Sequence, residues 1–278
     1  MDRIRKAAVA GSWYPGTAAA LGAAVDGHLA NADRDARDVA GTLAALICPH
    51  AGLIYSGPVA AYAYRLLRTR TFDVAILVGP SHFVGFDGVS IYPSGGFETP
   101  YGVASIDQQA ATALLSASPI VREHPAAHAR EHSLEMQLPF LKRLAPAAAI
   151  VPLVMGYQTA DTAHALGDAL AAVVRGRNAL LIASTDLSHY HDAATASRLD
   201  RVVLDCIERF DADALQAALA DNPEHACGGG PTVAVMRAAR LAGARDAAIL
   251  RYADSGDVSG DKSAVVGYAA AALGNFTS

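Results

Sequence analysis

Short apolar runs alternate with longer segments of helical periodicity along most of the chain, and this alternation constrains the fold more than any other feature. Apolar runs of this length are typical of strands buried on both faces of a parallel sheet, which amphipathic helices cover. We expect strands at about 43–48, 73–79, 148–154, 178–184, 246–253 and 263–270. We expect helices at about 57–68, 107–117, 132–144, 161–175, 194–209 and 231–242. The glycine-rich segment 83–102 departs from the pattern and predicts a short hairpin or flap.

No linker or repeat divides the chain, so these elements predict a single α/β domain, residues 1–278, with a central, mostly parallel sheet flanked by helices. Hydrophobic residues make up 52% of the chain and charged residues 18%, which is too apolar for a disordered protein. The net charge is −5 and the basic residues do not cluster, so we expect no nucleic-acid partner.

The sequence also indicates no contact with a membrane. No apolar stretch reaches the roughly 18 residues of a membrane span, and the first apolar patch is too short for a signal-peptide core. The three cysteines, Cys48, Cys206 and Cys227, are odd in number and widely spaced, which favours a reducing, cytoplasmic compartment. Cys206 lies on a helical apolar stripe and Cys48 lies inside an apolar strand, so we expect both to pack in the core.

Candidate ligand residues follow three of the expected strands directly. They are His50, His82, Asp186 and His189. Ligands of open α/β sheets bind outside the carboxyl ends of the strands, so we expect these side chains at one edge of the sheet. Cys227 precedes the glycine-rich start of the helix at 231–242, where a helix dipole and a nearby cation would favour its thiolate.

A single histidine beside a strand end is more often a hydrogen-bonded structural residue than a ligand. Three histidines and a cysteine at one edge instead indicate a metal site. Imidazole nitrogen and thiolate sulfur are shared ligands of zinc, iron and copper, whereas calcium and magnesium prefer oxygen.

A second polar cluster spans residues 128–135 and contains the H-x-x-E-H pattern of inverted zincins. The expected helix begins near His132, so His128 would lie before its first turn and point elsewhere. We therefore prefer to interpret Glu131 and His132 as substrate-binding residues of the pocket wall or as groups that orient the ligands. Trp13 and Tyr55 form either a packed anchor or an aromatic wall for a ring-bearing or peptide ligand.

A series of motifs occurs in order along nearly the whole chain. It comprises Trp13-Tyr14-Pro15, Pro49-His50-Ala51-Gly52 with Tyr55-Ser56-Gly57, Gly79-Pro80-Ser81-His82, Glu131-His132-Ser133-Leu134-Glu135, Ser184-Thr185-Asp186-Leu187-Ser188-His189-Tyr190, Cys227-Gly228 and Gly267-Tyr268. This set resembles the Memo family, whose prokaryotic members are known as protein B of the AmmeMemoRadiSam system. The resemblance implies a single-domain fold similar to that of the class III extradiol ring-cleaving dioxygenases.

By this resemblance, His50, His82 and Cys227 are metal ligands, and Asp186 and His189 are further pocket residues. The extradiol dioxygenases hold iron with two histidines and a carboxylate. A cysteine in the carboxylate's place argues against ring cleavage, because a thiolate is softer, accepts copper more readily and is vulnerable to oxidation. The resemblance also implies a functional link to a radical SAM protein and an AMMECR-type protein.

Three functions remain open at this stage. The first is a redox or dioxygenase-like protein with Fe(II) or copper and an unknown small substrate, in which His189, oriented by Asp186, acts as the general acid/base and Trp13 and Tyr55 contact the substrate. The second is an adaptor that binds a peptide or a phosphorylated ligand in the same pocket, as eukaryotic relatives in the family are described as signalling adaptors. The third is a zinc-dependent hydrolase with three protein ligands and a water.

Overall fold

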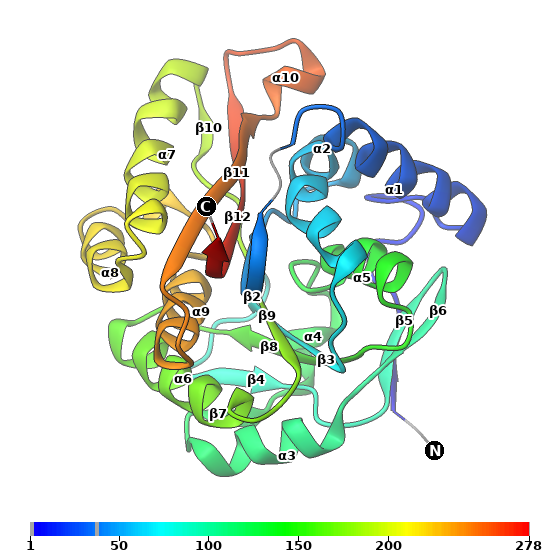
Figure 1. Cartoon of the computed structure of the whole chain (residues 1–278), viewed down its shortest axis with the longest axis vertical. Helices are drawn as coiled ribbons and strands as arrows, with labels where there is room; N and C mark the ends of the chain where they lie inside the picture. The colour runs from blue at the N-terminus through cyan, green and yellow to red at the C-terminus, as the bar shows by residue number, and fades with distance from the viewer. Residues whose placement is uncertain (1–2, 37–38, 278) are drawn as a thin grey trace.

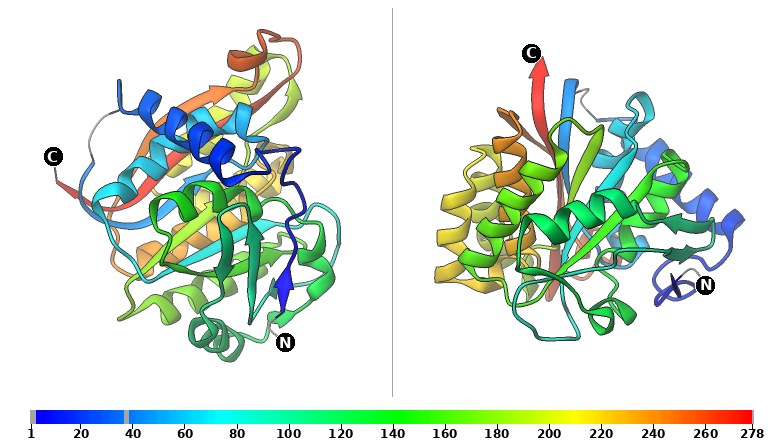
Figure 2. Two further views of the ribbon diagram at one scale, coloured as in Figure 1. Left: turned by 90° about the vertical axis from the view of Figure 1, so that its right-hand side faces the viewer. Right: turned by 90° about the horizontal axis from the view of Figure 1, so that it is seen from below.

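A mixed β-sheet lies at the centre of the molecule, with helices on both of its faces (Figure 1, Figure 2). The computed structural model describes residues 3–36 and 39–277. Residues 1–2, 37–38 and 278, which the expected domain includes, lie outside the described residues. The arrangement confirms the α/β class predicted from the sequence.

The large sheet has the strand order β10-β12-β2-β9-β3-β8-β4-β7, and β11 pairs with β12 outside this path. Its strands are β2 (Ala40–Cys48), β3 (Val74–Pro80), β4 (Val89–Ile91), β7 (Val121–Glu123), β8 (Ala149–Met155), β9 (Ala179–Ser184), β10 (His189–His191), β11 (Asp246–Asp254) and β12 (Val265–Thr277). Each apolar run that predicted a strand coincides with one of these strands to within three residues, except that β12 continues to Thr277, seven residues beyond the expected end.

The four central strands, β2, β9, β3 and β8, run parallel to one another. All seven residues of β3 are buried, as expected for a parallel strand covered on both faces. On the two flanks, β12 pairs antiparallel with β2, and β4 pairs antiparallel with β8. The sheet is therefore mixed, because an apolar run predicts the burial of a strand but not its direction.

Two helical layers cover the sheet, and the right panel of Figure 2 shows the sheet between them. Helices α7, α8 and α9 lie on one face, where α6 packs against α9, and helices α1 and α2 lie on the other. The helices are α1 (Ala18–Ala32), α2 (Leu53–Tyr64), α3 (Gln108–Ala117), α4 (Pro125–Ala129), α5 (Leu138–Leu144), α6 (Ala160–Val174), α7 (Ala193–Glu208), α8 (Ala212–Asp221), α9 (Gly229–Leu241) and α10 (Gly256–Ser259). Short 3₁₀ helices are η1 (Arg65–Thr69), η2 (Glu135–Gln137) and η3 (Pro223–His225).

A small second sheet joins the N-terminal segment to the middle of the chain. It consists of β1 (Ile4–Arg5), β5 (Gly96–Thr99) and β6 (Gly102–Ser105), with β1 parallel to β5. The hairpin predicted near the turn at residues 99–102 is the antiparallel pair β5 and β6.

Several helical segments differ from the sequence expectations. The helix expected over 132–144 is a 3₁₀ turn followed by α5, so Glu131 and His132 lie in irregular chain ahead of it. Helices α1 and α8 were not anticipated; α1 is rich in alanine and shows little contrast between its faces.

Cys48 and Cys206 are buried in the core, as expected. Among the described residues, no helix combines the length and the apolar character needed to cross a bilayer.

Candidate metal centre

Three central parallel strands place candidate residues at the same edge of the sheet. His50 lies two residues beyond the end of β2, His82 two residues beyond β3, and Asp186 two residues beyond β9. Because the strands are adjacent in the order β2-β9-β3, their carboxyl ends converge. Residues that follow these strands are far apart in the sequence but lie close together at this edge of the sheet.

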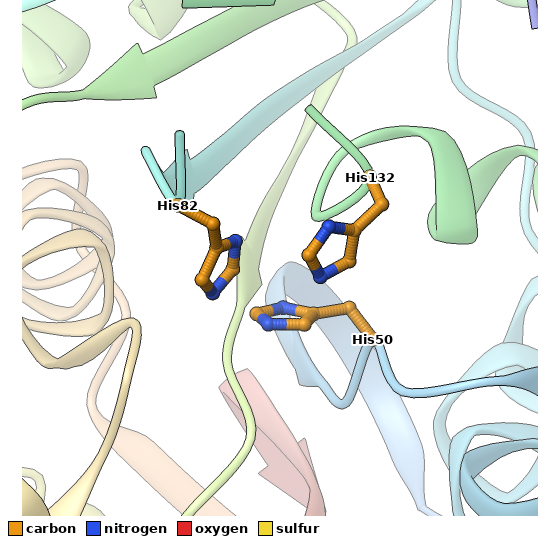
Figure 3. A group of neighbouring side chains, drawn as sticks. All are labelled: His50, His82 and His132. Atoms are coloured by element: carbon orange, nitrogen blue, oxygen red, sulfur yellow. The ribbon is translucent and has the colours of Figure 1, made fainter. Parts of the chain in front are cut away.

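Three imidazole rings meet at this edge (Figure 3). His50, His82 and His132 each offer one ring nitrogen, and these atoms lie within 4.8 Å of one another. The ring centroids of His50 and His82 are 5.2 Å apart, and the rings of His82 and His132 stack at 4.4 Å. We call these three residues the imidazole cluster, and it could hold a metal ion.

Hydrogen bonds at Nδ1 fix the tautomer of His50. Its Nδ1 lies 2.9 Å from Oγ of Ser184, which donates its only proton to the carbonyl oxygen of Ser133 at 2.7 Å. The hydroxyl oxygen must therefore accept the proton of His50 Nδ1, which leaves Nε2 unprotonated, with a lone pair that could bind a metal ion. Gln137 donates to the same hydroxyl oxygen at 2.7 Å and holds it in place.

Glu131 orients His82 in the same way. Its Oε1 lies 2.9 Å from His82 Nδ1, and its Oε2 accepts the backbone amide of His82 at 2.6 Å. The backbone amides of His132 and Ser133 also donate to Oε1, each at 2.9 Å. Burial alone would raise the pKa of Glu131, but the contacts with His82 and these amides outweigh it and lower the pKa to about 2. The carboxylate is thus ionised, and His82 presents Nε2 to the cluster.

Burial keeps two of the three rings neutral. It lowers the pKa of His50 well below its usual value, and the charges of His82, His132 and His189 lower it further. The pKa of His132 falls to about 4, first through burial and then through the charge of His82. Neutral imidazole is the form that binds a metal ion.

The thiol of Cys227 adjoins the imidazole cluster from the turn before α9. Its Sγ lies 3.2 Å from Nε2 of His50 and 3.3 Å from the backbone nitrogen of Asp186, which donates to it. Burial of the sulfur, followed by the charge of Asp186, raises the pKa of the thiol. The structure therefore brings Cys227 against His50, and it groups His132 with His50 and His82 as a third ring.

Asp186 and His189 flank this group but are held by different partners. Oδ1 of Asp186 accepts the backbone amides of His50 and Ala51 at 2.7 and 3.3 Å. His189 Nδ1 instead lies 2.8 Å from the carbonyl oxygen of Leu187. The expected orientation of His189 by Asp186 is thus replaced by a backbone contact, because the carboxylate is aimed at the loop after β2.

The two predicted aromatic residues occupy different places. The indole of Trp13 lies 4.4 Å from the ring of His132, so it borders the imidazole cluster. Tyr55, in the first turn of α2, lines a groove of about 530 Å³ together with residues of α1 and β11. Phe83, which the sequence analysis did not single out, also borders His132, with ring centroids 5.9 Å apart.

Ser184 and Gln137 help to position His50, a role that the sequence analysis did not assign to them. Ser184 ends β9, the strand between those that lead to His50 and His82, and this placement was the available signal. No feature of the sequence pointed to Gln137, because only the tertiary structure brings it to the site. Its Nε2 donates to the carbonyl oxygen of Pro49 at 3.1 Å and also to Ser184.

Fold and site together define an α/β domain with a histidine-rich candidate metal centre at the carboxyl edge of its parallel strands. The family model for Memo-like proteins matches residues 5–272. The chain belongs to the Memo family.

Relatives of nearly equal length support this assignment. A MEMO1 family protein of Methanothermobacter thermautotrophicus is 38% identical, covering 96% of this chain and 99% of its own. A MEMO1 family protein of Methanocaldococcus jannaschii is 36% identical over 98% of this chain and 99% of its own. The crystal structure of an uncharacterized protein from Escherichia coli K12 aligns with a TM-score of 0.56 at 16% identity, covering 82% of this chain and 99% of that one. That likeness concerns the fold alone.

Proposed function

We propose that this protein binds a redox-active transition metal, iron or copper, at the imidazole cluster and uses it in oxidoreductase chemistry on a small substrate. The observation that carries the proposal is the convergence of three imidazoles with the sulfur of Cys227 at one sheet edge. A bound ion of this kind would supply electron transfer and open coordination positions.

The donor atoms fit such an ion. His50 and His82 keep their Nδ1 protons in hydrogen bonds to Ser184 and Glu131, so both present Nε2, as metal-bound histidines do when a partner holds the second nitrogen. The distance of 3.2 Å from His50 Nε2 to Cys227 Sγ is close to the about 3.5 Å that ordinary Zn–N and Zn–S bond lengths set at a tetrahedral ion. His50 and His82 would hold the ion, and Cys227 and His132 are the two candidates for the third ligand.

Asp186 and His189 are proposed to move protons beside the ion. Burial raises the pKa of Asp186 to about 7, although the amides of His50 and Ala51 oppose that rise. A carboxyl group with such a pKa exchanges its proton near neutral pH, as a general acid or base must. His189 keeps Nε2 free because its Nδ1 is held by Leu187. Neither role needs a hydrogen bond between the two side chains.

The surroundings of Cys227 favour an uncharged substrate group. A cavity of about 530 Å³ adjoins this residue, within the usual size range for small-molecule pockets. Its lining contains polar but uncharged side chains, including Gln158, Thr159 and Gln216, together with apolar residues, and no charged side chain among the described residues. Trp13 supplies an aromatic surface beside His132.

Anaerobic purification followed by elemental analysis tests the metal site. We expect close to one iron or copper per chain, lost in His50→Gln and His82→Gln. His164→Gln is the matched control, because His164 lies in α6 beside Asp213 and outside the cluster. Comparing Cys227→Ser with His132→Gln assigns the third ligand, since the larger loss of metal identifies it.

The metal found also separates the alternatives. Iron or copper with oxygen uptake supports the redox proposal, and stoichiometric zinc without oxygen uptake points to a hydrolase. A wild-type protein that binds none of these ions and still binds a peptide overturns the proposal in favour of an adaptor. Full metal content in the two histidine variants would refute the ligand assignment.

A further inference from the structure

The carboxylate of Glu135 lies beneath the N-terminal segment that carries Trp13. We call residues 8–14 the N-terminal strap. Glu135 accepts the backbone amides of Ala8 and Val9 at 2.8 and 3.0 Å. It also accepts the hydroxyl of Tyr14 at 2.7 Å and pairs with the guanidinium of Arg5. The side chains of both ion-pair partners are almost completely buried.

The strap is folded on itself and tied to the site at its far end. The amide of Trp13 donates to the carbonyl of Val9 at 2.9 Å. The carbonyl of Trp13 in turn accepts the amide of Leu53, the first residue of α2, at 2.8 Å. Leu53 follows His50 by three residues, so the strap spans from Glu135 to the loop that carries a member of the imidazole cluster.

We propose that Glu135 is a positioning residue: by clamping the N-terminal strap it keeps the indole of Trp13 against His132 as a fixed wall of the imidazole cluster. The role as a wall rests on the proposed function, whereas the clamp itself concerns only the fold. A carboxylate can accept all four donors at once, but a glutamine at the same position would offer an NH₂ group to donors. The strap would then lose part of its attachment.

Trp13 is the single tryptophan of the chain, so its fluorescence reports on the strap without a label. The first variant is Glu135→Gln. The matched control is Glu123→Gln, because Glu123 makes an exposed ion pair with Arg3 and has no contact with the strap among the described residues. Emission wavelength and the acrylamide quenching constant are measured for both, alongside circular dichroism.

The clamp predicts a red-shifted emission in Glu135→Gln. Its acrylamide quenching constant should rise by about twofold, because Trp13 is 39% exposed while the strap is attached and most of its remaining surface becomes accessible on release. Glu123→Gln should match the wild type. A folded Glu135→Gln protein with wild-type emission and quenching overturns the proposal.

Loss of Glu135 leaves Arg5 buried without its partner, which is costly, so this variant can fail to fold. Tyr14→Phe then tests the clamp, because it removes one of the four donors to Glu135 and keeps the ion pair with Arg5. We expect a smaller rise in quenching in the same direction, and an unchanged constant in this variant also contradicts the clamp.

Titration with Co²⁺ separates the two proposals. In the wild type, an ion bound at the imidazole cluster should quench Trp13, which borders His132. In Glu135→Gln, Co²⁺ absorption should persist while the quenching weakens. If Co²⁺ does not bind the wild type, the proposed function fails, but the acrylamide comparison still tests the clamp.

Discussion

Replacing His128 by phenylalanine is expected to make the fold less sensitive to acid. His128 is fully buried near the small sheet, and its ring packs edge-on against Tyr92 and Phe97 at 5.5 and 6.1 Å between centroids. Within residues 3–36 and 39–277, neither of its ring nitrogens has a hydrogen-bond partner. Burial, reinforced by the charge of Arg5, lowers its pKa to about 3. A phenyl ring keeps the contacts and removes the titration.

The direction of the change in the free energy of unfolding follows from how many protons the folded and unfolded states bind. The unfolded chain protonates His128 below an ordinary pKa of about 6.5, whereas the folded chain keeps it neutral down to about pH 3, so the unfolded state binds more protons over this interval. The free energy of unfolding therefore falls as the pH drops below 6.5. Between pH 7 and pH 5 this one residue should remove about 2 kcal/mol, a figure that holds for any folded pKa below about 4.

Urea unfolding at pH 7 and pH 5, followed by circular dichroism, measures this term. The wild type should lose about 2 kcal/mol more than His128→Phe over the interval, because all other titrating groups are shared by the two proteins. Equal losses in wild type and His128→Phe would show that His128 is protonated in the folded state and refute the reasoning.

Three further substitutions test the site and the backbone. Glu131→Gln should weaken metal binding by about 10- to 100-fold in a Co²⁺ titration, because an amide cannot reproduce both contacts that orient His82; unchanged affinity would contradict this role. Gly267→Ala should lower the free energy of unfolding by about 3 kcal/mol, since its Cβ would lie 2.0 Å from Oδ2 of the buried Asp200. Gly27→Ala, on α1 with open space around the new methyl group, should instead raise it by about 0.5–1 kcal/mol, and a loss there would discredit the steric argument.

Hydrophobic patterning predicted the strands that build the site because these strands are buried on both faces. β3 is the clearest case: an uninterrupted buried run ends at Pro80, and His82 follows at once. The same reasoning placed His50 after β2 and Asp186 after β9. A candidate site residue can therefore be located from the sequence when it lies within a few positions of the end of a continuous apolar run. The run predicts a buried strand, and ligands bind at the carboxyl ends of parallel strands.

Strand direction and the short strands lay beyond this kind of inference. The antiparallel pairing of β4 with β8 depends on where the chain returns after the loop at residues 81–88, which no local period encodes. β4 and β7 are three residues each, too short for a periodic signal. Their places are set by contacts with strands far along the chain.

His132 shows how a tertiary contact overrides a local motif. The H-x-x-E-H letters would place His128 and His132 on one face of a helix, where the amide of His132 would donate to the carbonyl of His128. In the structure, the carbonyl of His128 instead accepts Nε of Arg5 at 2.9 Å, and the amide of His132 donates to Oε1 of Glu131. Both groups that would continue the helix are thus engaged elsewhere, and α4 ends at Ala129.

Because α4 ends at Ala129, His128 and His132 point to different parts of the molecule. His128 turns into the core beside Tyr92, while His132 joins the imidazole cluster, where stacking on His82 holds it. Arg5 lies 123 residues from His128 along the chain, so no window of local sequence could have revealed that it replaces the helical hydrogen bond. The same guanidinium pairs with Glu135 under the N-terminal strap, so one buried cation both ends the helix before His132 and joins the clamp that positions Trp13 against it.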